Sequence, residues 1–244
     1  MRNVLVTGGA SGLGRALVDA YSAQPDTTVI SLDRTLQRDL RKNVRTFVVD
    51  VTSEAAVNEF VSLLLNVRPT PIDLAIHSAG IRGLVPALEK AHPEDVATCE
   101  TLQAMDLETM QRAFSVNTLG TFTLLRALIP LLHLTSAPKV IVMSSRMGSI
   151  GNNQLGNKDA GSAYAYRASK AALNMIVRSF AVDVPRIAWV MCHPGRVETG
   201  LVDTIEEGAI SAEESVSDLL PLIQGWDRSD TGMFYDRFGD RIEW

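Results

Sequence analysis

Hydrophobic residues along this 244-residue chain alternate between short β-branched runs and longer segments with helical spacing. The short runs predict seven strands, at residues 3–7, 28–32, 46–51, 72–77, 139–143, 187–192 and 232–235. The longer segments predict helices at 13–23, 54–66, 107–133, 162–184 and 213–224, and a loop with a short helix after Pro93 within residues 82–105. Apolar strands separated by helices are typical of parallel sheets covered on both faces, so we expect an α/β, doubly wound sheet.

Composition narrows the class of protein. Apolar residues make up 46% of the chain and no Pro/Gly/Ser-rich linker divides it, so residues 1–244 are expected to form a single domain. The formal net charge is −5 without a basic stripe, which argues against nucleic acid or an anionic membrane as partner. The apolar stretch at 124–134 is interrupted by Arg126, Pro130 and His133 and is too short to span a bilayer.

Two cysteines do not make a disulfide framework, and Cys99 and Cys192 are expected to be reduced thiols. The first residues are typical of a strand and a turn, not of a signal peptide. We therefore expect a cytoplasmic protein.

A glycine-rich turn follows the first predicted strand, in the order Thr7-Gly-Gly-Ala-Ser-Gly-Leu-Gly14, with Ala10, Ser11 and Leu13 between its glycines. Gly8 permits a sharp turn, Gly12 lets the backbone approach a pyrophosphate, and Gly14 lets the helix pack on the strand. The N-terminus of that helix offers free N–H groups to an anion. A tight turn without a ligand is the alternative. A P-loop is excluded because no Gly-Lys-Ser/Thr is present.

Two acidic residues at later strand ends suggest how a dinucleotide would be held. Asp33 can accept both hydrogen bonds from an adenosine ribose diol and would repel a 2′-phosphate, which favours NAD over NADP. The neighbouring Arg34 keeps NADP as the less favoured alternative, because a guanidinium can accept a phosphate. Asp50 could bind the adenine amino group while Val51 packs on the ring, or Asp50 could instead cap the next helix.

The chemistry depends on Tyr166 and Lys170, which lie one turn apart on the helix after the fifth strand, close in the chain to Ser145. A tyrosine phenol ordinarily has a pKa near 10, and a nearby ammonium favours the phenolate. Tyr166 could then exchange a proton with the substrate oxygen, which Ser145 would hold in place. Taken alone, a Tyr–Lys pair at this spacing is better explained by a solvated or core-edge helix face, and its place one strand–helix step after Ser145 is what favours catalysis.

Taken together, these motifs resemble the short-chain dehydrogenase/reductase family over nearly the whole chain. The matching positions are Gly8-x3-Gly12-x-Gly14, Asp50-Val51, Ala79-Gly80, Asn117, Ser145, Tyr166-x3-Lys170 and Pro194-Gly195-x-Val197-x-Thr199. The resemblance implies a Rossmann-type domain with a catalytic tetrad of Asn117, Ser145, Tyr166 and Lys170. It also implies further cofactor contacts from Ser78, Ala79, Gly80, Pro194, Gly195, Val197 and Thr199. For Asn117, merely breaking a helix is the alternative role.

The chain departs from the family pattern at two places. His77 stands where the family has an asparagine that braces the sheet, and we expect a hydrogen-bonded structural histidine there. The segment between Thr199 and the helix at 213 is short, which suggests an open or weakly selective substrate site. Residues 144–149 and 232–244 are similar to the C-factor-like, sniffer-like branch of the family.

The sequence therefore predicts an NAD(H)-dependent oxidoreductase that moves a hydride between nicotinamide and a carbonyl or secondary alcohol. The alternatives are a nucleotide-binding signalling or regulatory protein with little turnover, and a methyltransferase. The expected partners are a small-molecule substrate and further copies of this chain, as a homodimer or homotetramer. For that assembly the resemblance implies two long helices, with apolar residues Leu124, Leu128, Leu131, Ala171, Met175 and Ile176 that fit either core or interface.

Overall fold

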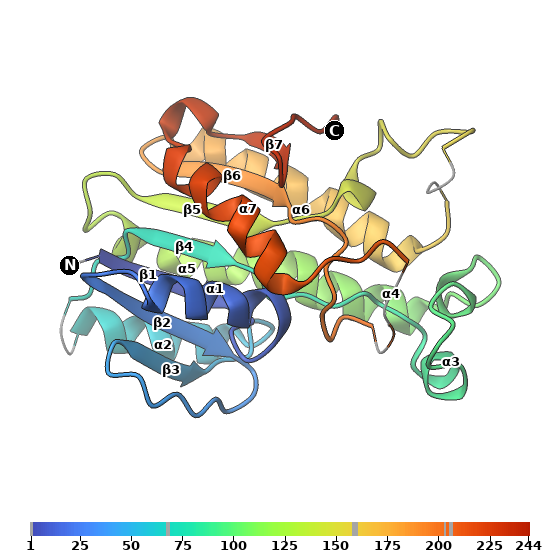
Figure 1. The fold of residues 1–244 in the computed structure, drawn as a ribbon, viewed down its shortest axis with the longest axis horizontal. Coiled ribbons are helices and arrows are strands. Elements are labelled where there is room, and N and C mark those ends of the chain that lie inside the picture. Colours follow the sequence, from blue (N-terminus) through green and yellow to red (C-terminus); the bar gives the residue numbers. More distant parts are fainter. Residues whose placement is uncertain (1, 67–68, 158–160, 203, 205–206) are drawn as a thin grey trace.

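The computed structural model describes residues 2–66, 69–157, 161–202, 204 and 207–244. Its strands form one parallel sheet in the order β3-β2-β1-β4-β5-β6-β7 (Figure 1). They are β1 (Arg2–Thr7), β2 (Thr27–Asp33), β3 (Val44–Val48), β4 (Leu74–His77), β5 (Lys139–Met143), β6 (Ala188–His193) and β7 (Met233–Asp236). The predicted seven-stranded, doubly wound parallel sheet is confirmed.

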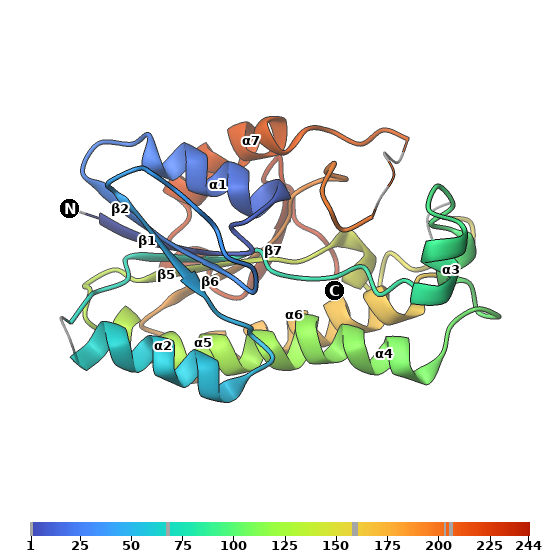
Figure 2. The ribbon, with the colours of Figure 1, turned by 90° about the horizontal axis from the view of Figure 1, so that it is seen from below.

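Helices cover both faces of the sheet (Figure 2). One face carries α1 (Gly12–Ser22) and α7 (Ala212–Gly225), and the other carries α2 (Glu54–Asn66), α5 (Thr121–Leu132) and α6 (Tyr164–Asp183). A shorter α4 (Leu107–Phe114) precedes α5, and α3 (Pro86–Ala91) projects at one end of the molecule. Single 3-10 turns lie at η1 (Thr98–Glu100), η3 (Arg146–Gly148) and η4 (Arg228–Asp230).

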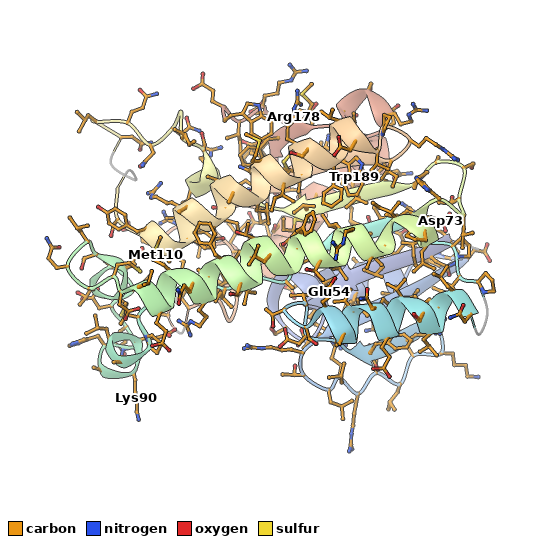
Figure 3. All side chains as sticks on the ribbon, turned by 180° about the vertical axis from the view of Figure 1, so that it is seen from behind. Glu54, Asp73, Lys90, Met110, Arg178 and Trp189 are labelled. Atoms are coloured by element: carbon orange, nitrogen blue, oxygen red, sulfur yellow. The ribbon has the colours of Figure 1, made fainter. Side chains whose placement is uncertain are left out.

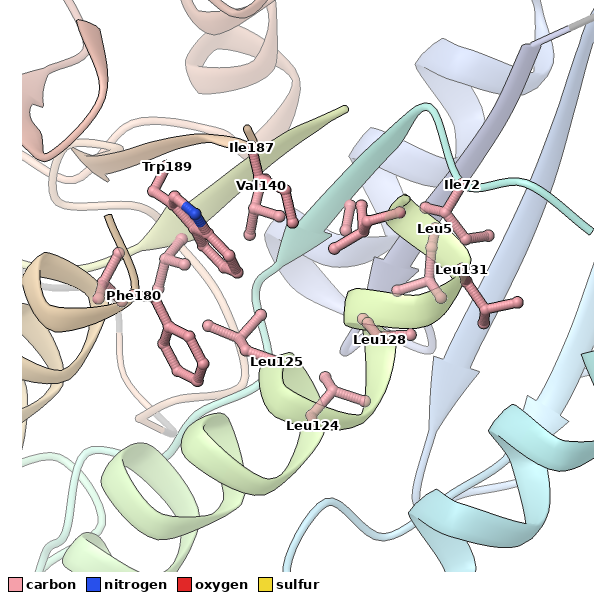
Figure 4. Close-up of a cluster of buried hydrophobic side chains, with 14 of the residues drawn as sticks. Leu5, Ile72, Leu124, Leu125, Leu128, Leu131, Val140, Phe180, Ile187 and Trp189 are labelled. Atoms are coloured by element: carbon pink, nitrogen blue, oxygen red, sulfur yellow. The ribbon is translucent and has the colours of Figure 1, made fainter. Parts of the chain in front are cut away.

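The larger hydrophobic cluster lies between the sheet and the α2/α5/α6 layer (Figure 4). The Phe180 ring stacks on Trp189 of β6, with ring centroids 5.0 Å apart. Leu124, Leu128 and Leu131 of α5 are at most 1% exposed in this cluster, so they belong to the core and not to a subunit interface. Burial of each such leucine contributes roughly 1.5–3 kcal/mol to folding.

The helical run Leu107–Leu132 is long and apolar enough to cross a membrane by length and composition, but half of its apolar window is buried inside the protein. A single such helix is weak evidence for a membrane span, because a core helix passes the same test. The sequence predicted one regular helix over residues 107–133, and this prediction was wrong. A π-helical segment, η2 (Ser115–Gly120), separates α4 from α5 and contains Asn117.

Helix caps follow local sequence. The Asp106 carboxylate caps α4 by accepting a hydrogen bond from the Thr109 N–H. At α2 the cap is Ser53, whose Oγ accepts from the Ala56 N–H. Thr52 does not cap α2, because its N–H and hydroxyl both donate to Asp50 in the preceding turn.

Two predicted boundaries were wrong. The short helix lies before Pro93, at α3, where Pro86 occupies the first helical turn and needs no N–H partner. Between Pro93 and residue 105, all of which the structure describes, the one helical element is the 3-10 turn η1. Strand β3 ends at Val48, so Asp50 and Val51 follow the strand and do not close it. The β-branched composition of 46–51 extends the apparent strand beyond its last ladder pair, Asp33 with Val48.

Candidate active site

A cleft of about 2020 Å³ opens beyond the carboxyl ends of the strands. This is where a doubly wound sheet binds its ligands. All of the predicted cofactor-binding residues line it, together with Ser145, Tyr166 and Lys170. Asn117 is fully buried behind the wall of the cleft.

The glycine turn is shaped by close contacts. A Cβ placed on Gly14 would lie 2.1 Å from the carbonyl oxygen of Gly8, so α1 can pack this closely on β1 only with glycine here. Gly12 has a positive φ of 51°, and a Cβ there would lie 2.8 Å from the Thr199 side chain. The turn after β1 therefore touches the loop after β6.

The N-terminus of α1 is available to an anion. Its N-cap residue, Ser11, makes no side-chain capping hydrogen bond within the described structure. The first residues of the helix line the cleft, and the N-cap side chain takes none of their N–H groups, which is an arrangement that can bind a pyrophosphate.

The acidic residue at the end of β2 has local partners as well. Asp33 accepts hydrogen bonds from the Ala10 N–H at 3.1 Å and from the N–H and hydroxyl of Thr35 at 2.9 and 2.8 Å. It thereby ties the end of β2 to the glycine turn. Arg34 lines the same part of the cleft. Asp50 accepts from Thr52, which supports a turn-forming role and leaves an adenine contact as a prediction.

His77 braces the sheet from the end of β4. Its Nδ1 shares a 2.9 Å hydrogen bond with the Thr7 hydroxyl, and its Nε2 shares one of 2.8 Å with the Thr121 hydroxyl. Complete burial, and secondarily the charge of Lys170, lowers the pKa of His77 to about 3, so the ring is neutral at pH 7. The predicted hydrogen-bonded structural histidine is confirmed.

The three predicted reactive side chains are nearly buried. Ser145 is 6%, Tyr166 9% and Lys170 5% exposed. Lys170 Nζ donates to the Met143 carbonyl oxygen at 2.9 Å and lies 5.7 Å from the centroid of the Tyr166 ring. Burial lowers the pKa of Lys170 to about 8, so the ammonium remains mostly charged at pH 7 and gives up its proton more readily than a surface lysine.

Ser145 and Tyr166 each have a neighbouring hydroxyl residue, Ser144 and Tyr164, whose surroundings differ from theirs. The Ser144 hydroxyl donates to Asn174 Oδ1 at 2.5 Å and so is directed into α6. The Ser145 Oγ accepts a 3.2 Å hydrogen bond from the Met147 N–H, which leaves its own proton for another acceptor. Tyr164 is 40% exposed, whereas Tyr166 is buried against the cleft.

Asn117 does more than interrupt a helix. Its Oδ1 accepts from the Ile81 N–H at 2.8 Å, and its Nδ2 donates to the Ile81 carbonyl and to the Ser169 hydroxyl at 2.9 and 3.0 Å. It therefore joins the segment after β4 to the helix that carries Tyr166. A Cβ on Gly80 would lie 3.1 Å from Asn117 Oδ1 and 3.6 Å from Lys170 Nζ, so these groups converge at one point.

Sequence reasoning missed several polar side chains of the cleft. Arg82 lies over the Tyr166 ring, with 5.0 Å from its guanidinium carbon to the ring centroid, and pairs with Glu100. His193 Nδ1 and Gln37 Nε2 are buried without a hydrogen-bond partner in the described residues, and burial, then Arg146, lowers the pKa of His193 to about 4. His193 directly precedes the recognised Pro194-Gly195 pair, which was a usable signal, whereas Arg82 and Glu100 belong to no local pattern.

The outer wall of the cleft comes from residues 84–101. Leu84, Val96 and Cys99 form a small buried cluster against which Val202, from the loop after β6, packs. The stretch between Thr199 and α7 (Ala212–Gly225) is short, as its sequence predicts. Part of it, residues 203 and 205–206, lies outside the described residues.

The sheet order, the glycine turn at a helix N-terminus and the cleft at the strand ends define a Rossmann-type α/β protein of the nucleotide-binding class. The profile of one family, described as short chain dehydrogenase, matches residues 2–209. The chain belongs to the short-chain dehydrogenase/reductase family, which confirms the resemblance found in the sequence.

Individual relatives agree with this assignment. The C-signal protein of Myxococcus xanthus is 34% identical over 181 residues, which is 73% of this chain and 96% of the relative. The short chain dehydrogenase gsfK of Penicillium aethiopicum is 30% identical over 99% of this chain and 98% of its own. Among solved structures, a carbonyl reductase from chicken fatty liver with NADPH bound superimposes with a TM-score of 0.83 at 27% identity, covering 100% and 99% of the two chains. Carbonyl reductase Sniffer of D. melanogaster gives 0.80 at 25%, covering both chains fully.

Proposed function

We propose that this chain is an NAD(H)-dependent oxidoreductase that transfers a hydride between nicotinamide and a carbonyl or secondary alcohol carbon. The observation that carries the proposal is the convergence of Ser145, Tyr166 and Lys170 on one cleft that also contains the glycine turn. The uncapped N-terminus of α1 and the glycine contacts fit a dinucleotide pyrophosphate. When bound, the nicotinamide supplies the hydride chemistry.

The residues of this chain supply positioning and proton transfer. Ser145 donates a hydrogen bond to the substrate oxygen and holds it beside the phenol. Tyr166 gives a proton to that oxygen during reduction and takes it back during oxidation. Lys170, a buried cation 5.7 Å from the centroid of the Tyr166 ring, favours the phenolate and would hold the ribose hydroxyls of a bound nicotinamide nucleotide. Asn117 holds α6 and the segment that follows β4 together behind these three side chains, through its hydrogen bonds to Ser169 and Ile81.

The choice of dinucleotide is argued from charge. The Asp33 carboxylate at the end of β2 would repel a 2′-phosphate, so we propose NAD(H). The chicken carbonyl reductase was solved with NADPH, and Arg34 provides this chain with a cation beside Asp33. NADP(H) is therefore the alternative dinucleotide, which the guanidinium of Arg34 could accommodate.

Tyr166→Phe tests the reaction assignment. Removing the phenolic oxygen leaves the packing of the ring unchanged but eliminates the acid–base group, so we expect kcat for reduction of an aromatic aldehyde by NADH to fall roughly 10²–10⁴-fold. NADH affinity should stay within about twofold, as measured by isothermal titration calorimetry. Tyr164→Phe is the matched control and should leave kcat unchanged. Wild-type turnover in Tyr166→Phe would refute the assignment.

A second candidate is a nucleotide-binding signalling protein with little turnover, because the C-signal protein is among the relatives. In that case Tyr166→Phe would keep both dinucleotide binding and biological activity. Methyl transfer does not require the Ser145–Tyr166–Lys170 arrangement. A methyltransferase would be supported only if S-adenosylmethionine, and not NADH, raised the melting temperature of the protein.

We further propose one domain over residues 1–244, a cytoplasmic location and a homo-oligomer.

A further inference from the structure

A buried ion pair lies at the edge of the active-site cleft. Arg82 follows β4, and Glu100 belongs to the turn η1. The Arg82 Nε and Nη2 donate to the two carboxylate oxygens of Glu100 at 2.8 and 2.9 Å, which makes the pair bidentate. The side chains are 13% and 9% exposed. A buried ion pair gains little net stability because both charges lose water, so its presence suggests a positional role.

The guanidinium of Arg82 contacts the catalytic centre. It lies over the face of the Tyr166 ring, 5.0 Å from the centroid. Its Nη1 donates to Met147 Sδ at 3.3 Å, two residues after Ser145. Arg82 therefore spans from the phenol of Tyr166 to the turn that follows the serine. A planar guanidinium stacked on a ring restricts the directions in which that ring can tilt.

Glu100 also holds the start of the helix that carries Tyr166. Its carbonyl oxygen accepts the Ser162 hydroxyl and the Ala163 N–H, both at 2.9 Å. Ser162 and Ala163 have φ values of 51° and 48°, in the left-handed region that side chains other than glycine rarely adopt. Two successive residues in this region persist only where their surroundings hold them. Through its backbone and its side chain, Glu100 thus contacts both the entry to α6 and the arginine on Tyr166.

We propose that Arg82, held by Glu100, is a positioning residue that fixes the direction of the Tyr166 phenol within the cleft. The inference rests on the proposed function, since it takes Tyr166 as the proton donor and acceptor. It adds that residues 82–101 orient the catalytic tyrosine as well as forming the wall of the cleft. The bidentate geometry requires arginine, because an ammonium cannot present two parallel N–H groups.

The test uses Arg82→Gln, Arg82→Lys and Glu100→Gln in the full-length protein. Arg126→Gln is the matched control: Arg126 also pairs with a carboxylate, Glu54, and also lies over a ring, at 5.1 Å from the Phe122 centroid. That pair is exposed on the outer helices, where Figure 3 labels Glu54 on α2. If the Arg82–Glu100 pair were merely structural, replacing it would change stability only.

The first readout needs no substrate. The chain has four tyrosines, so protein labelled with ¹³Cζ-tyrosine gives four NMR signals, and Tyr166→Phe assigns one of them. We expect the Tyr166 signal to shift and broaden in Arg82→Gln and Glu100→Gln, and to stay as in wild type in Arg126→Gln. Arg82→Lys should give an intermediate result.

The second readout is steady-state reduction of 4-nitrobenzaldehyde by NADH. We expect kcat to fall roughly 10- to 100-fold in Arg82→Gln, with partial rescue in Arg82→Lys, while KM for NADH changes less than about twofold. If a single variant does not fold, the double variant Arg82→Gln/Glu100→Gln is used in its place, because it removes both buried charges. We expect the same fall in kcat and the same change in the Tyr166 signal.

The outcomes separate the two proposals. A wild-type Tyr166 signal and kcat in Arg82→Gln overturn the positioning role while the proposed function stands. Full activity in Tyr166→Phe overturns the proposed function, and the NMR signal still decides whether Arg82 orients the ring.

Discussion

At the scale of single residues, burial sets chemical properties that the residue type does not. Lys170 and His77 both lose water on folding, and the pKa of each falls, to about 8 and about 3. The consequences differ because the ordinary pKa of lysine, 10.5, is well above that of histidine, 6.5. Lys170 remains mostly charged at pH 7 and can act on the phenol, whereas His77 stays neutral and serves as a brace between Thr7 and Thr121.

Asp33→Ala tests the dinucleotide preference. Removing the carboxylate removes both the ribose acceptor and the repulsion of a 2′-phosphate, so the ratio of kcat/KM for NADH over NADPH should fall about tenfold or more, equal to about 1.4 kcal/mol. The variant also loses the hydrogen bonds to Ala10 and Thr35, which weakens both dinucleotides and cancels in the ratio. A wild type that already prefers NADPH tenfold would contradict the NAD assignment.

At the scale of elements, the site depends on how closely neighbouring elements approach. The glycine turn joins β1 to α1 at a distance that a side chain would prevent, and η2 places Asn117 where its amide reaches both Ile81 and Ser169. The strand-to-helix turn was recognised from its glycines. The π-helical segment was not, because residues 115–120 share the apolar spacing of a regular helix.

Gly14→Ala tests the packing of α1 on β1. The added methyl group would meet the Gly8 carbonyl oxygen at 2.1 Å, so α1 must shift away from the strand. We expect the free energy of unfolding to fall by about 1–3 kcal/mol in urea titrations and NADH affinity to fall at least tenfold in calorimetry. Gly225→Ala is the control, because the added carbon would meet no described heavy atom within 4 Å beyond its chain neighbours and the backbone of its own helix, and it should change stability by less than about 0.5 kcal/mol. Equal behaviour of the two variants would disprove the contact.

At the scale of the whole molecule, helices α4 to α6 have an apolar outer surface as well as a buried one. Leu119, Phe122, Met175 and Val182 are 38–71% exposed, while Leu124, Leu128 and Leu131 of α5, for which the sequence left core and interface open, are buried in the core. The sequence could not separate the two faces, since both sides of these helices are apolar. The exposed set is the surface through which we expect copies of the chain to associate.

Met175→Glu tests this association. A charge introduced into an apolar interface is costly to bury, so we expect the oligomer measured by light scattering after gel filtration to dissociate to monomers. The secondary structure should be unchanged in circular dichroism. Leu63→Glu is the control, because Leu63 is 43% exposed on α2, outside the proposed surface, and should leave the oligomer intact. A monomeric wild type would remove the basis for the proposal.

The sequence by itself determined the order of strands and helices along the chain and the glycine turn, since each depends on residues close together in the chain. It also identified the family, through local motifs that recur in order over nearly the whole chain. The tertiary structure decided which groups meet across long separations: Arg82 with Glu100 and Tyr166, Asn117 with Ile81 and Ser169, and His77 between Thr7 and Thr121. It also decided which apolar faces are buried. Local periodicity records hydrophobicity and spacing, but a pKa, an ion pair or a buried face depends on neighbours that only the folded chain brings together.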